Sequence, residues 1–440
     1  MVRKFLLLYA AICTAPAAGQ SLGDRVDDLF AAWDRPDSPG AAVVISRGDS
    51  VFYARGYGAA QLDYGVPITP RTVFMVASVS KQFTAYSIAL LAMQGKVDLD
   101  APVRRYLPEL HEYAMPITVR QLIHHTSGLR DEFGLLAMAG YRMDDVITKD
   151  DILRLIYRQR KLNFEPGSEY LYSNSGYTLL AEITERITGQ SFSAWTRAMI
   201  FEPLGMHDSH FRDDHSTVIA GLAQGYVTSG DSYRMQLVNY ASVGASGLYT
   251  TAPDLARWLQ YLGDDSAEGS DIRSLVHTRG ALANGDTLDY AFGLAHGQFR
   301  GARRIGHSGS HRGFLTWAGR FPDHDLSIVI LSNLEEFNPS DMANQVAALF
   351  IEDESLVNFE GVYYSGELDT RYTLSVREDS LRLQTARGLE TTLRRTGLNT
   401  FVSPTWYLSE ISFSREDSRI TGLSVSYSRT RDVRFARLDP

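Results

Sequence analysis

The stretch of sequence that decides the fold is Ser78-Val79-Ser80-Lys81, which is followed directly by the apolar run QFTAYSIALLAM at residues 82–93. Apolar residues fall on nearly every side of this run, and Gly95 follows it as a stop signal. The pattern predicts a helix that is buried on all faces. Ser78 and Lys81 are three residues apart at its first turn, so their side chains share one face and can meet.

Ser78 and Lys81 are candidate reactive groups. A serine hydroxyl is a poor nucleophile until a base takes its proton, and a lysine withdrawn from water can have its pKa lowered enough to help. The first turn of a helix also offers unpaired backbone N–H groups that stabilise negative charge. The same spacing also fits a helix-capping serine beside a snorkelling lysine, so the pair needs support from further motifs.

Strand patterns flank a mostly helical middle. Apolar runs at residues 41–45 and 51–57 surround Arg47-Gly48-Asp49 and predict a hairpin. Further strands are expected at residues 290–294, 314–321 and 326–331, and helices at residues 22–33, 151–157, 176–187, 253–262 and 339–350. A sheet built from both ends of a segment, with helices between, indicates an α/β fold with a helical insertion.

The N-terminus has the pattern of a signal peptide. Arg3 and Lys4 precede an apolar run from Phe5 to Ile12, and small residues follow it, which predicts export to the periplasm or the cell exterior. The run is too short to span a bilayer, so no stable membrane insertion is expected. Cys13, the only cysteine, lies in this segment, so a mature chain would have no disulfide and no thiolate metal site.

Composition and pattern divide the chain into three predicted parts. These are a signal peptide at residues 1–19, an α/β domain at 20–354, and a C-terminal β domain at 355–440, where short alternating apolar runs predict an antiparallel barrel or sandwich. The net charge of -9 argues against binding of nucleic acid, which needs clustered Lys and Arg. Small molecules or peptides are the expected ligands, and the sequence leaves the oligomeric state open.

A second motif is Tyr172-Ser173-Asn174, which is expected on a loop before a helix. A tyrosine near a lysine cation can be biased toward the phenolate and can relay protons, and an asparagine amide can orient both lysine and substrate. A packing tyrosine beside an asparagine helix cap would give the same letters.

The third motif is Gly306-His307-Ser308-Gly309-Ser310, ahead of the strand expected at residues 314–321. Glycines at these positions allow the backbone to approach a ligand closely, as an edge strand beside an active site requires. The same letters nearly spell the G-x-S-x-G nucleophile elbow, but the last position is Ser310 and no acid and histidine follow in the required order.

Taken in order, Ser78-x-x-Lys81, Tyr172-x-Asn174 and His307-x-Gly309 resemble the three motifs of the family that contains class C β-lactamases, D-Ala-D-Ala carboxypeptidases, D-aminopeptidases and related esterases. Supporting phrases are ITVRQLIHHTSGL at 117–129, FEPLGM at 201–206, GASGLYTTAPD at 244–254 and LSN at 331–333. The resemblance runs from about Val26 to Phe350 and implies the β-lactamase and penicillin-binding-protein fold: an antiparallel sheet flanked by helices.

The resemblance implies a role for each motif residue. Ser78 would be the acylated nucleophile, with Lys81 and Tyr172 as its proton-transfer partners. The other motif residues, Asn174, His307, Gly309 and Ser310, would bind the substrate, and the backbone N–H of Ser310 would face that of Ser78 in the oxyanion hole. The reaction would be metal-free and cofactor-free acyl transfer to water from an ester, a D-amino-acid peptide or a β-lactam.

One position departs from the pattern of β-lactamases and carboxypeptidases, which usually have lysine where this chain has His307. A histidine is usual in the esterase and aminopeptidase branches. The carboxylate of a β-lactam or peptide substrate would therefore lack its usual fixed cation.

Other readings compete with this one. A run of His and Asp side chains could bind zinc, although a solvated polar loop explains it better: His207, Asp208, His210, Asp213, Asp214 and His215. His124 and His125 are expected to be turn and packing residues. At the level of the whole protein there are two alternatives on the same fold: a non-catalytic sensor that binds cell-wall peptides or β-lactams, and a structural surface protein that keeps the fold as a scaffold.

Overall fold

The protein is described by a computed structural model, which covers residues 21–263, 270–351, 356–377, 380–397, 399–416 and 419–438. The predicted signal peptide with Cys13, and the predicted domain boundary at 354/355, lie outside these residues and stay predictions.

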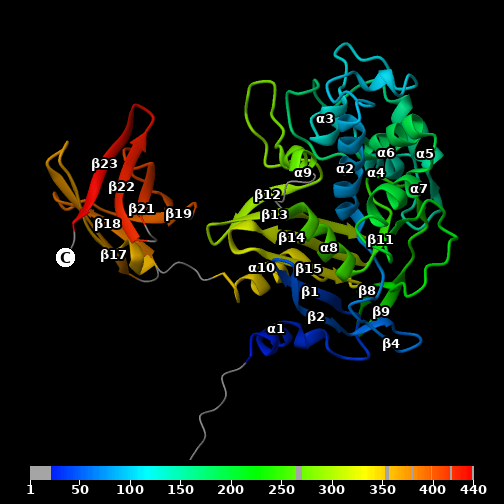
Figure 1. Ribbon diagram of the computed structural model, residues 1–440, viewed down its shortest axis with the longest axis horizontal. Helices are drawn as coiled ribbons and strands as arrows, with labels where there is room; N and C mark the ends of the chain where they lie inside the picture. Colours follow the sequence, from blue (N-terminus) through cyan, green and yellow to red (C-terminus); the bar gives the residue numbers. More distant parts are fainter. Residues whose placement is uncertain are drawn as a thin grey trace, which may run out of the picture.

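One antiparallel sheet forms the centre of the N-terminal part, with the strand order β12-β13-β14-β15-β1-β2 (Figure 1). Its strands are β1 (Ala41–Arg47), β2 (Ser50–Tyr57), β12 (Ala295–Phe299), β13 (Ala302–His311), β14 (Phe314–Phe321) and β15 (Leu326–Ser332). Strand β1 pairs with β15 from Ala41 opposite Ser332 to Arg47 opposite Leu326. The expectation of a sheet built from both ends of a segment is confirmed.

The two faces of this sheet follow from the alternation of side chains along β1. Ala41, Val43 and Ile45 point into a core that includes residues of α1 (Leu22–Phe30) and α10 (Pro339–Ala347). The residues between them, such as Val44, point into the other core, which contains the helical region. Because both faces are covered by helices, β1 reads as a continuous apolar run rather than an alternating one.

The helical region lies between β2 and β12 in the sequence and packs around α2 (Ser80–Met93), which is buried on all sides as predicted (Figure 1). Its other helices are α3 (Val119–Ile123), α4 (Glu132–Met138), α5 (Lys149–Arg158), α6 (Asn174–Thr188), α7 (Phe192–Thr196), α8 (Ala252–Gly263) and α9 (Ser270–His277). Short strands also occur here: β3 (Ala59–Gln61), β4 (Val66–Pro67), β5 (Phe74–Met75), β6 (Ile147–Thr148), β7 (His210–Phe211), β8 (Gly225–Ser229), β9 (Ser232–Gln236), β10 (Tyr240–Ala241) and β11 (Leu248–Thr250).

The C-terminal part is a closed eight-stranded barrel, which settles the choice between barrel and sandwich. Its strands are β16 (Gly361–Ser365), β17 (Thr370–Arg377), β18 (Ser380–Thr385), β19 (Glu390–Arg395), β20 (Thr400–Val402), β21 (Glu410–Glu416), β22 (Arg419–Tyr427) and β23 (Thr430–Leu438). Alternate side chains, among them Leu374, Leu383 and Phe413, fill its interior.

The strand predicted at residues 290–294 is wrong. Tyr290, Phe292 and Leu294 are buried in the helical core, and the sheet strand β12 begins only at Ala295. At Gly293 the backbone turns with φ 70° against α2, where an added Cβ would lie 2.6 Å from the Lys81 carbonyl oxygen. The apolar run thus reflects burial in a loop against α2, not strand alternation.

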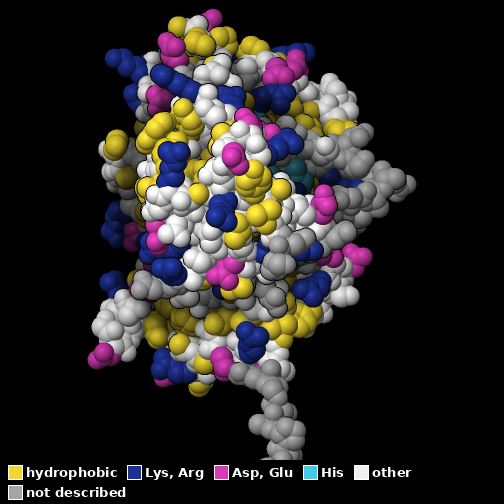
Figure 2. All heavy atoms as spheres, turned by 90° about the vertical axis from the view of Figure 1, so that its left-hand side faces the viewer, with side chains coloured by type: hydrophobic (Ala, Val, Ile, Leu, Met, Phe, Trp, Pro, Cys, Tyr) yellow, Lys and Arg dark blue, Asp and Glu magenta, His cyan; other side chains and the backbone are white. Residues whose placement is uncertain are grey.

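Charged side chains of both signs are interspersed on the face drawn in Figure 2, rather than gathered into one basic field. Within the described ranges, no helix is long and apolar enough to cross a membrane.

Candidate active site

Ser78 lies in a short 3-10 turn (Ala77–Val79) that runs directly into α2. The residue before it, Ala77, has φ 45°, a left-handed conformation that costs energy for a residue with a Cβ. The sheet supports this turn, because the Thr316 hydroxyl of β14 donates to the Val76 carbonyl at 3.1 Å. The nucleophile predicted from the sequence is therefore partly exposed on a constrained backbone.

Lys81 is fully buried and its amine has three hydrogen-bond partners. Nζ lies 3.2 Å from Ser78 Oγ, 2.7 Å from Asn174 Oδ1 and 2.8 Å from the Ala245 carbonyl oxygen. Burial lowers the pKa of Lys81 to about 7, against the opposing effect of two nearby carboxylates. The amine is thus balanced between its charged and neutral forms near neutral pH.

Two adjacent acids, Asp131 and Glu132, supply those carboxylates, and the sequence analysis missed both. Asp131 Oδ2 accepts hydrogen bonds from the backbone N and from Nδ2 of Asn174, each at 2.7 Å. Glu132 is fully buried and accepts from Thr178 at 2.7 Å and from Tyr240 at 2.6 Å. Burial raises the pKa of Glu132 to about 7.

Tyr172 stands beside this group, with its ring centroid 4.9 Å from Lys81 Nζ. Its hydroxyl is buried and makes no normal hydrogen bond to any described residue. Burial raises the pKa of Tyr172 above its usual value, and the neighbouring Ser78 side chain opposes this effect. The bias toward phenolate considered from the sequence is therefore wrong: Tyr172 is a neutral phenol, which can donate a proton but is a poor initial base.

His125 packs against Tyr172, with ring centroids 4.2 Å apart. Its Nδ1 accepts from the backbone N–H of Ser173 at 3.1 Å, and burial holds its pKa well below the usual range. Both observations are consistent with the interpretation of this histidine as a packing residue, because its neutral ring packs on Tyr172 and accepts from the backbone of Ser173.

His307 lies on β13 with its ring centroid 6.1 Å from that of Tyr172, and it too is neutral. Its Nδ1–H donates to the Ser308 carbonyl at 2.6 Å, and its Nε2 accepts from the Tyr290 hydroxyl at 3.0 Å. Burial and then the charge of Lys81 lower the pKa of His307 to about 4. Among the described residues, Lys81 is the one cation that acts on this imidazole.

Strand β13 passes close to the nucleophile at Gly309. A Cβ added there would lie 2.2 Å from the Val76 carbonyl oxygen and 3.1 Å from Ser78 N, so only glycine allows this approach. Pairing of β13 with β12 ends at Gly306, whereas pairing with β14 continues to His311, which leaves one edge of residues 307–311 outside the sheet. Ser310 lies on this segment, and its N–H stays the predicted second oxyanion donor.

The structure thus brings Ser78, Lys81, Tyr172, Asn174 and the β13 motif into one site. Tyr290, Asp131 and Glu132 have polar side chains that can be read from the sequence, but they lie outside the three motifs and were not predicted as site residues. The Ala245 carbonyl had no side-chain signal at all, although it belongs to the GASG phrase.

The polar run at residues 207–215 does not form a comparable centre. Asp208 pairs with Arg71 at 2.7 Å, and His210 stacks on Tyr249. Across the part of the chain that the structure describes, no three His, Cys, Asp or Glu side chains converge as metal ligands would.

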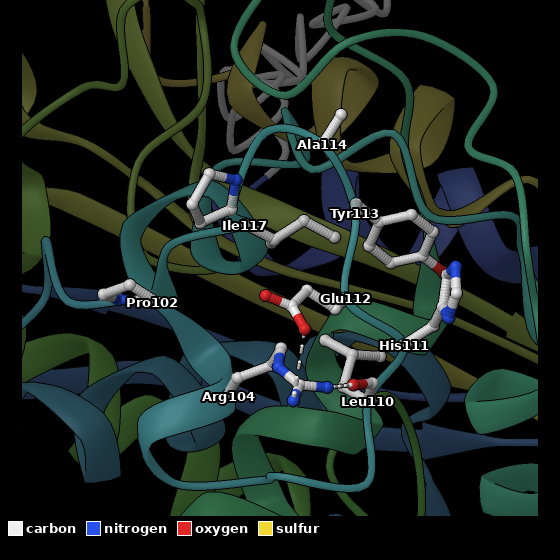
Figure 3. Close-up of a pocket in the computed structure, with 9 residues that line it drawn as sticks. Pro102, Arg104, Leu110, His111, Glu112, Tyr113, Ala114 and Ile117 are labelled. Atoms are coloured by element: carbon white, nitrogen blue, oxygen red, sulfur yellow. Dashed lines mark hydrogen bonds and ion pairs between the residues drawn. The ribbon is translucent and has the colours of Figure 1, made fainter.

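A separate cavity of about 280 Å³ lies beside the loop that leads to α3 (Figure 3). Arg104 donates there to the Leu110 carbonyl and lies 3.9 Å from Glu112. Its lining consists of Pro102, Arg104, Leu110, His111, Glu112, Tyr113, Ala114, Pro116 and Ile117. No predicted site residue belongs to this lining, so the cavity is distinct from the Ser78 site.

Residues 26–352 match the model of the Beta-lactamase family. The chain belongs to that family. Because it is a family of serine hydrolases, the predicted enzyme class is confirmed, and the matched range contains all of the predicted site residues.

Two relatives extend the comparison. The chain is 29% identical over 333 residues to a penicillin-binding protein of Bacillus subtilis (strain 168), covering 72% of this chain and 73% of that protein. It is 26% identical over 397 residues to a D-aminopeptidase of Gluconobacter oxydans (strain 621H), covering 90% of this chain and 71% of the relative.

Solved structures show the same fold. The octameric penicillin-binding protein homologue of Pyrococcus abyssi aligns with a TM-score of 0.65 at 22% identity, over 94% of this chain and 99% of that one. The D-amino acid amidase of Ochrobactrum anthropi SV3 aligns with a TM-score of 0.62 at 24% identity, over 74% of this chain and 97% of that one. The predicted fold class is confirmed.

Proposed function

We propose that the protein is an exported serine hydrolase that cleaves small esters or D-aminoacyl amides through an acyl-enzyme on Ser78. The arrangement of hydrogen bonds at Lys81 carries this proposal. Both the Asn174 and the Ala245 partners are carbonyl oxygens, which can only accept, at 2.7 and 2.8 Å. A neutral amine has two N–H groups, and both are used there. In the neutral form the lone pair is left for the third partner, Ser78 Oγ at 3.2 Å, and can accept its proton, whereas the charged amine donates to the same oxygen.

We infer the chemical steps from these contacts and from the place of Tyr172 beside Lys81 and Ser78. Ser78 Oγ bonds to the substrate carbonyl carbon while its proton passes to Lys81 Nζ. The Tyr172 hydroxyl gives its proton to the leaving oxygen or nitrogen as the scissile bond breaks, and the Lys81 ammonium restores that proton to Tyr172. Water then attacks the acyl-enzyme, gives a proton to Lys81, and Ser78 Oγ leaves with a proton returned from it.

Substrate choice is inferred from the neutral His307. A pKa of about 4 leaves this imidazole uncharged at neutral pH, so it can donate or accept a hydrogen bond but cannot hold a carboxylate as lysine would. We therefore infer a preference for substrates without a carboxylate next to the leaving group. Relatives described as D-aminopeptidase and D-amino acid amidase support amides of D-amino acids as the first class to test.

Export rests on the signal-peptide pattern of residues 1–19, which predicts a periplasmic or secreted protein. N-terminal sequencing of the protein recovered from the periplasm or medium tests it. A chain that keeps Met1 and stays in the cytoplasm would contradict it.

The catalytic proposal is tested with a panel of p-nitrophenyl esters, D- and L-amino-acid amides, and a chromogenic cephalosporin, followed by intact-mass measurement. We expect turnover of the esters and D-amides and a covalent adduct that Ser78→Ala removes. The L-amides are the matched control for stereochemistry. Binding that persists in Ser78→Ala, with no turnover in the wild type, would favour the non-catalytic sensor instead.

A further inference from the structure

Asp131 uses its two carboxylate oxygens for different purposes. Oδ1 accepts the backbone N–H of Phe133 at 3.0 Å and so caps α4. Oδ2 takes no part in the cap and instead holds Asn174 by two hydrogen bonds. A residue that only began a helix would have no need of the second set of contacts.

Those contacts fix the orientation of the Asn174 amide. Because a carboxylate can only accept, the amide nitrogen must face Asp131, and the amide oxygen then faces Lys81 Nζ at 2.7 Å. Without Asp131 the amide could rotate, and its NH₂ group would meet the amine as a second donor.

We propose that Asp131 is a positioning residue of the reaction, which holds Asn174 so that its carbonyl oxygen sets the Lys81 amine against Ser78. The inference rests on the proposed function, since it assigns the relay to the same acyl transfer. It adds a link that none of the three motifs contains.

The neighbouring Glu132 provides a contrast, because it acts on Lys81 without touching it. Both of its oxygens are occupied by Thr178 and Tyr240. The charged or titratable groups that face Lys81 are the carboxylates of Asp131 and Glu132, the imidazoles of His125 and His307, and the phenols of Tyr172 and Tyr177. Once Lys81 is neutral, the acids no longer change its protonation state. Their remaining charge effect, on the ammonium that forms during acylation, is common to both acids, so comparison with Glu132→Gln separates it from an effect on geometry.

The test therefore measures the rate of Ser78 acylation by a neutral ester as a function of pH, with intact-mass or stopped-flow detection. The rate is expected to rise with pH as Lys81 loses its proton, which is called the acid limb, and then to become constant, which is called the plateau. We expect Asp131→Ala to lower the plateau rate about 100-fold, as for a misplaced catalytic group. Asp131→Asn, which keeps one oxygen for Asn174, should recover at least tenfold of that loss. Asp131→Asn should also move the acid limb to lower pH, because the charge that raises the pKa of Lys81 is gone.

Glu132→Gln is the comparison variant. It should move the acid limb in the same direction but leave the plateau rate within about threefold of the wild type.

Two controls separate the relay from simple loss of stability. Thr148→Ala removes a comparable helix cap on α5, where Thr148 Oγ1 accepts from Asp151 N at 3.2 Å without any link to Asn174. It should lower the melting temperature as Asp131→Ala does, yet keep the plateau rate. In a double-mutant cycle, Asp131→Ala should add little to the loss caused by Asn174→Ala.

The outcomes are distinguishable. If the wild type forms no acyl-enzyme, the proposed function fails. If it acylates but Asp131→Ala loses no more than Thr148→Ala, or if the Asp131 and Asn174 effects multiply, the relay is overturned. Should Asp131→Ala fail to fold, Asp131→Ser decides, because a serine has a single side-chain oxygen that can cap α4 but cannot also hold Asn174. A plateau rate well below that of Glu132→Gln supports the relay, and a plateau rate equal to it overturns the relay.

Discussion

The two groups of residues that surround Ser78, one from the helical region and one from strand β13, differ in charge. In the helical region, the Lys81 wall (Lys81, Asp131, Glu132 and Asn174) brings together an amine and two carboxylates in one network. On strand β13, the His307 wall (residues 307–310 with Tyr290) is neutral, because burial lowers the pKa of its imidazole, which lies between a carbonyl and a phenol. Charged groups therefore lie where the proton is transferred, and not where the strand meets the substrate.

This difference suggests that the two walls can change separately. The Lys81 wall must keep its geometry, because each N–H of the neutral amine has its own acceptor, Asn174 or Ala245. None of the hydrogen bonds at Lys81 involves His307, so we expect that the residue at 307 can change without loss of the nucleophile. Substitutions in the two walls should accordingly change the rate and the specificity, respectively.

The largest effect is expected at the Lys81 wall. Lys81→Met keeps most of the buried volume but removes the base, and should lower kcat/KM for a neutral ester by about 10⁴-fold, the upper end for a positioned base. Lys96→Met, at an exposed lysine just beyond α2, is the matched control and should have no effect. A loss below tenfold in Lys81→Met would show that another group activates Ser78.

A smaller effect, which depends on the leaving group, is expected for Tyr172→Phe. The raised pKa of Tyr172 makes it a proton donor, and an amide nitrogen needs that proton far more than p-nitrophenolate does. We expect a loss of about 10³-fold for a D-amino-acid amide and less than tenfold for the p-nitrophenyl ester. Equal losses on both substrates would assign Tyr172 to the activation of Ser78 instead.

The smallest effect is expected at the neutral wall. His307→Lys should raise kcat/KM for a carboxylate-bearing cephalosporin relative to a neutral ester by about tenfold, which corresponds to about 1.4 kcal/mol. His307→Met, which is long but uncharged, separates charge from length and should leave the ratio unchanged. A wild type that already favours the cephalosporin strongly would refute this account of the wall.

The sequence predicted those parts of the site that depend on short spacing. Ser78 and Lys81 meet because they are one helical turn apart, and Gly309 was identified because only glycine allows so close an approach. The tie between Asp131 and Asn174 spans 43 positions and joins two helix starts, so no local pattern carries it. The run at 290–294 was misjudged because burial in a loop and burial in a strand give the same apolar letters.

The measurement that tests the central claim most directly is the pH dependence of Ser78 acylation by a neutral ester, followed before the steady state. Lys81 must be neutral to accept the proton, so the rate should rise with pH about a midpoint near 7 and remain high on the alkaline side, where Tyr172 keeps its proton. A rate that does not depend on pH in this range, or one that rises only near the ordinary lysine pKa of about 10.4, would contradict the claim that a buried, neutral Lys81 activates the nucleophile.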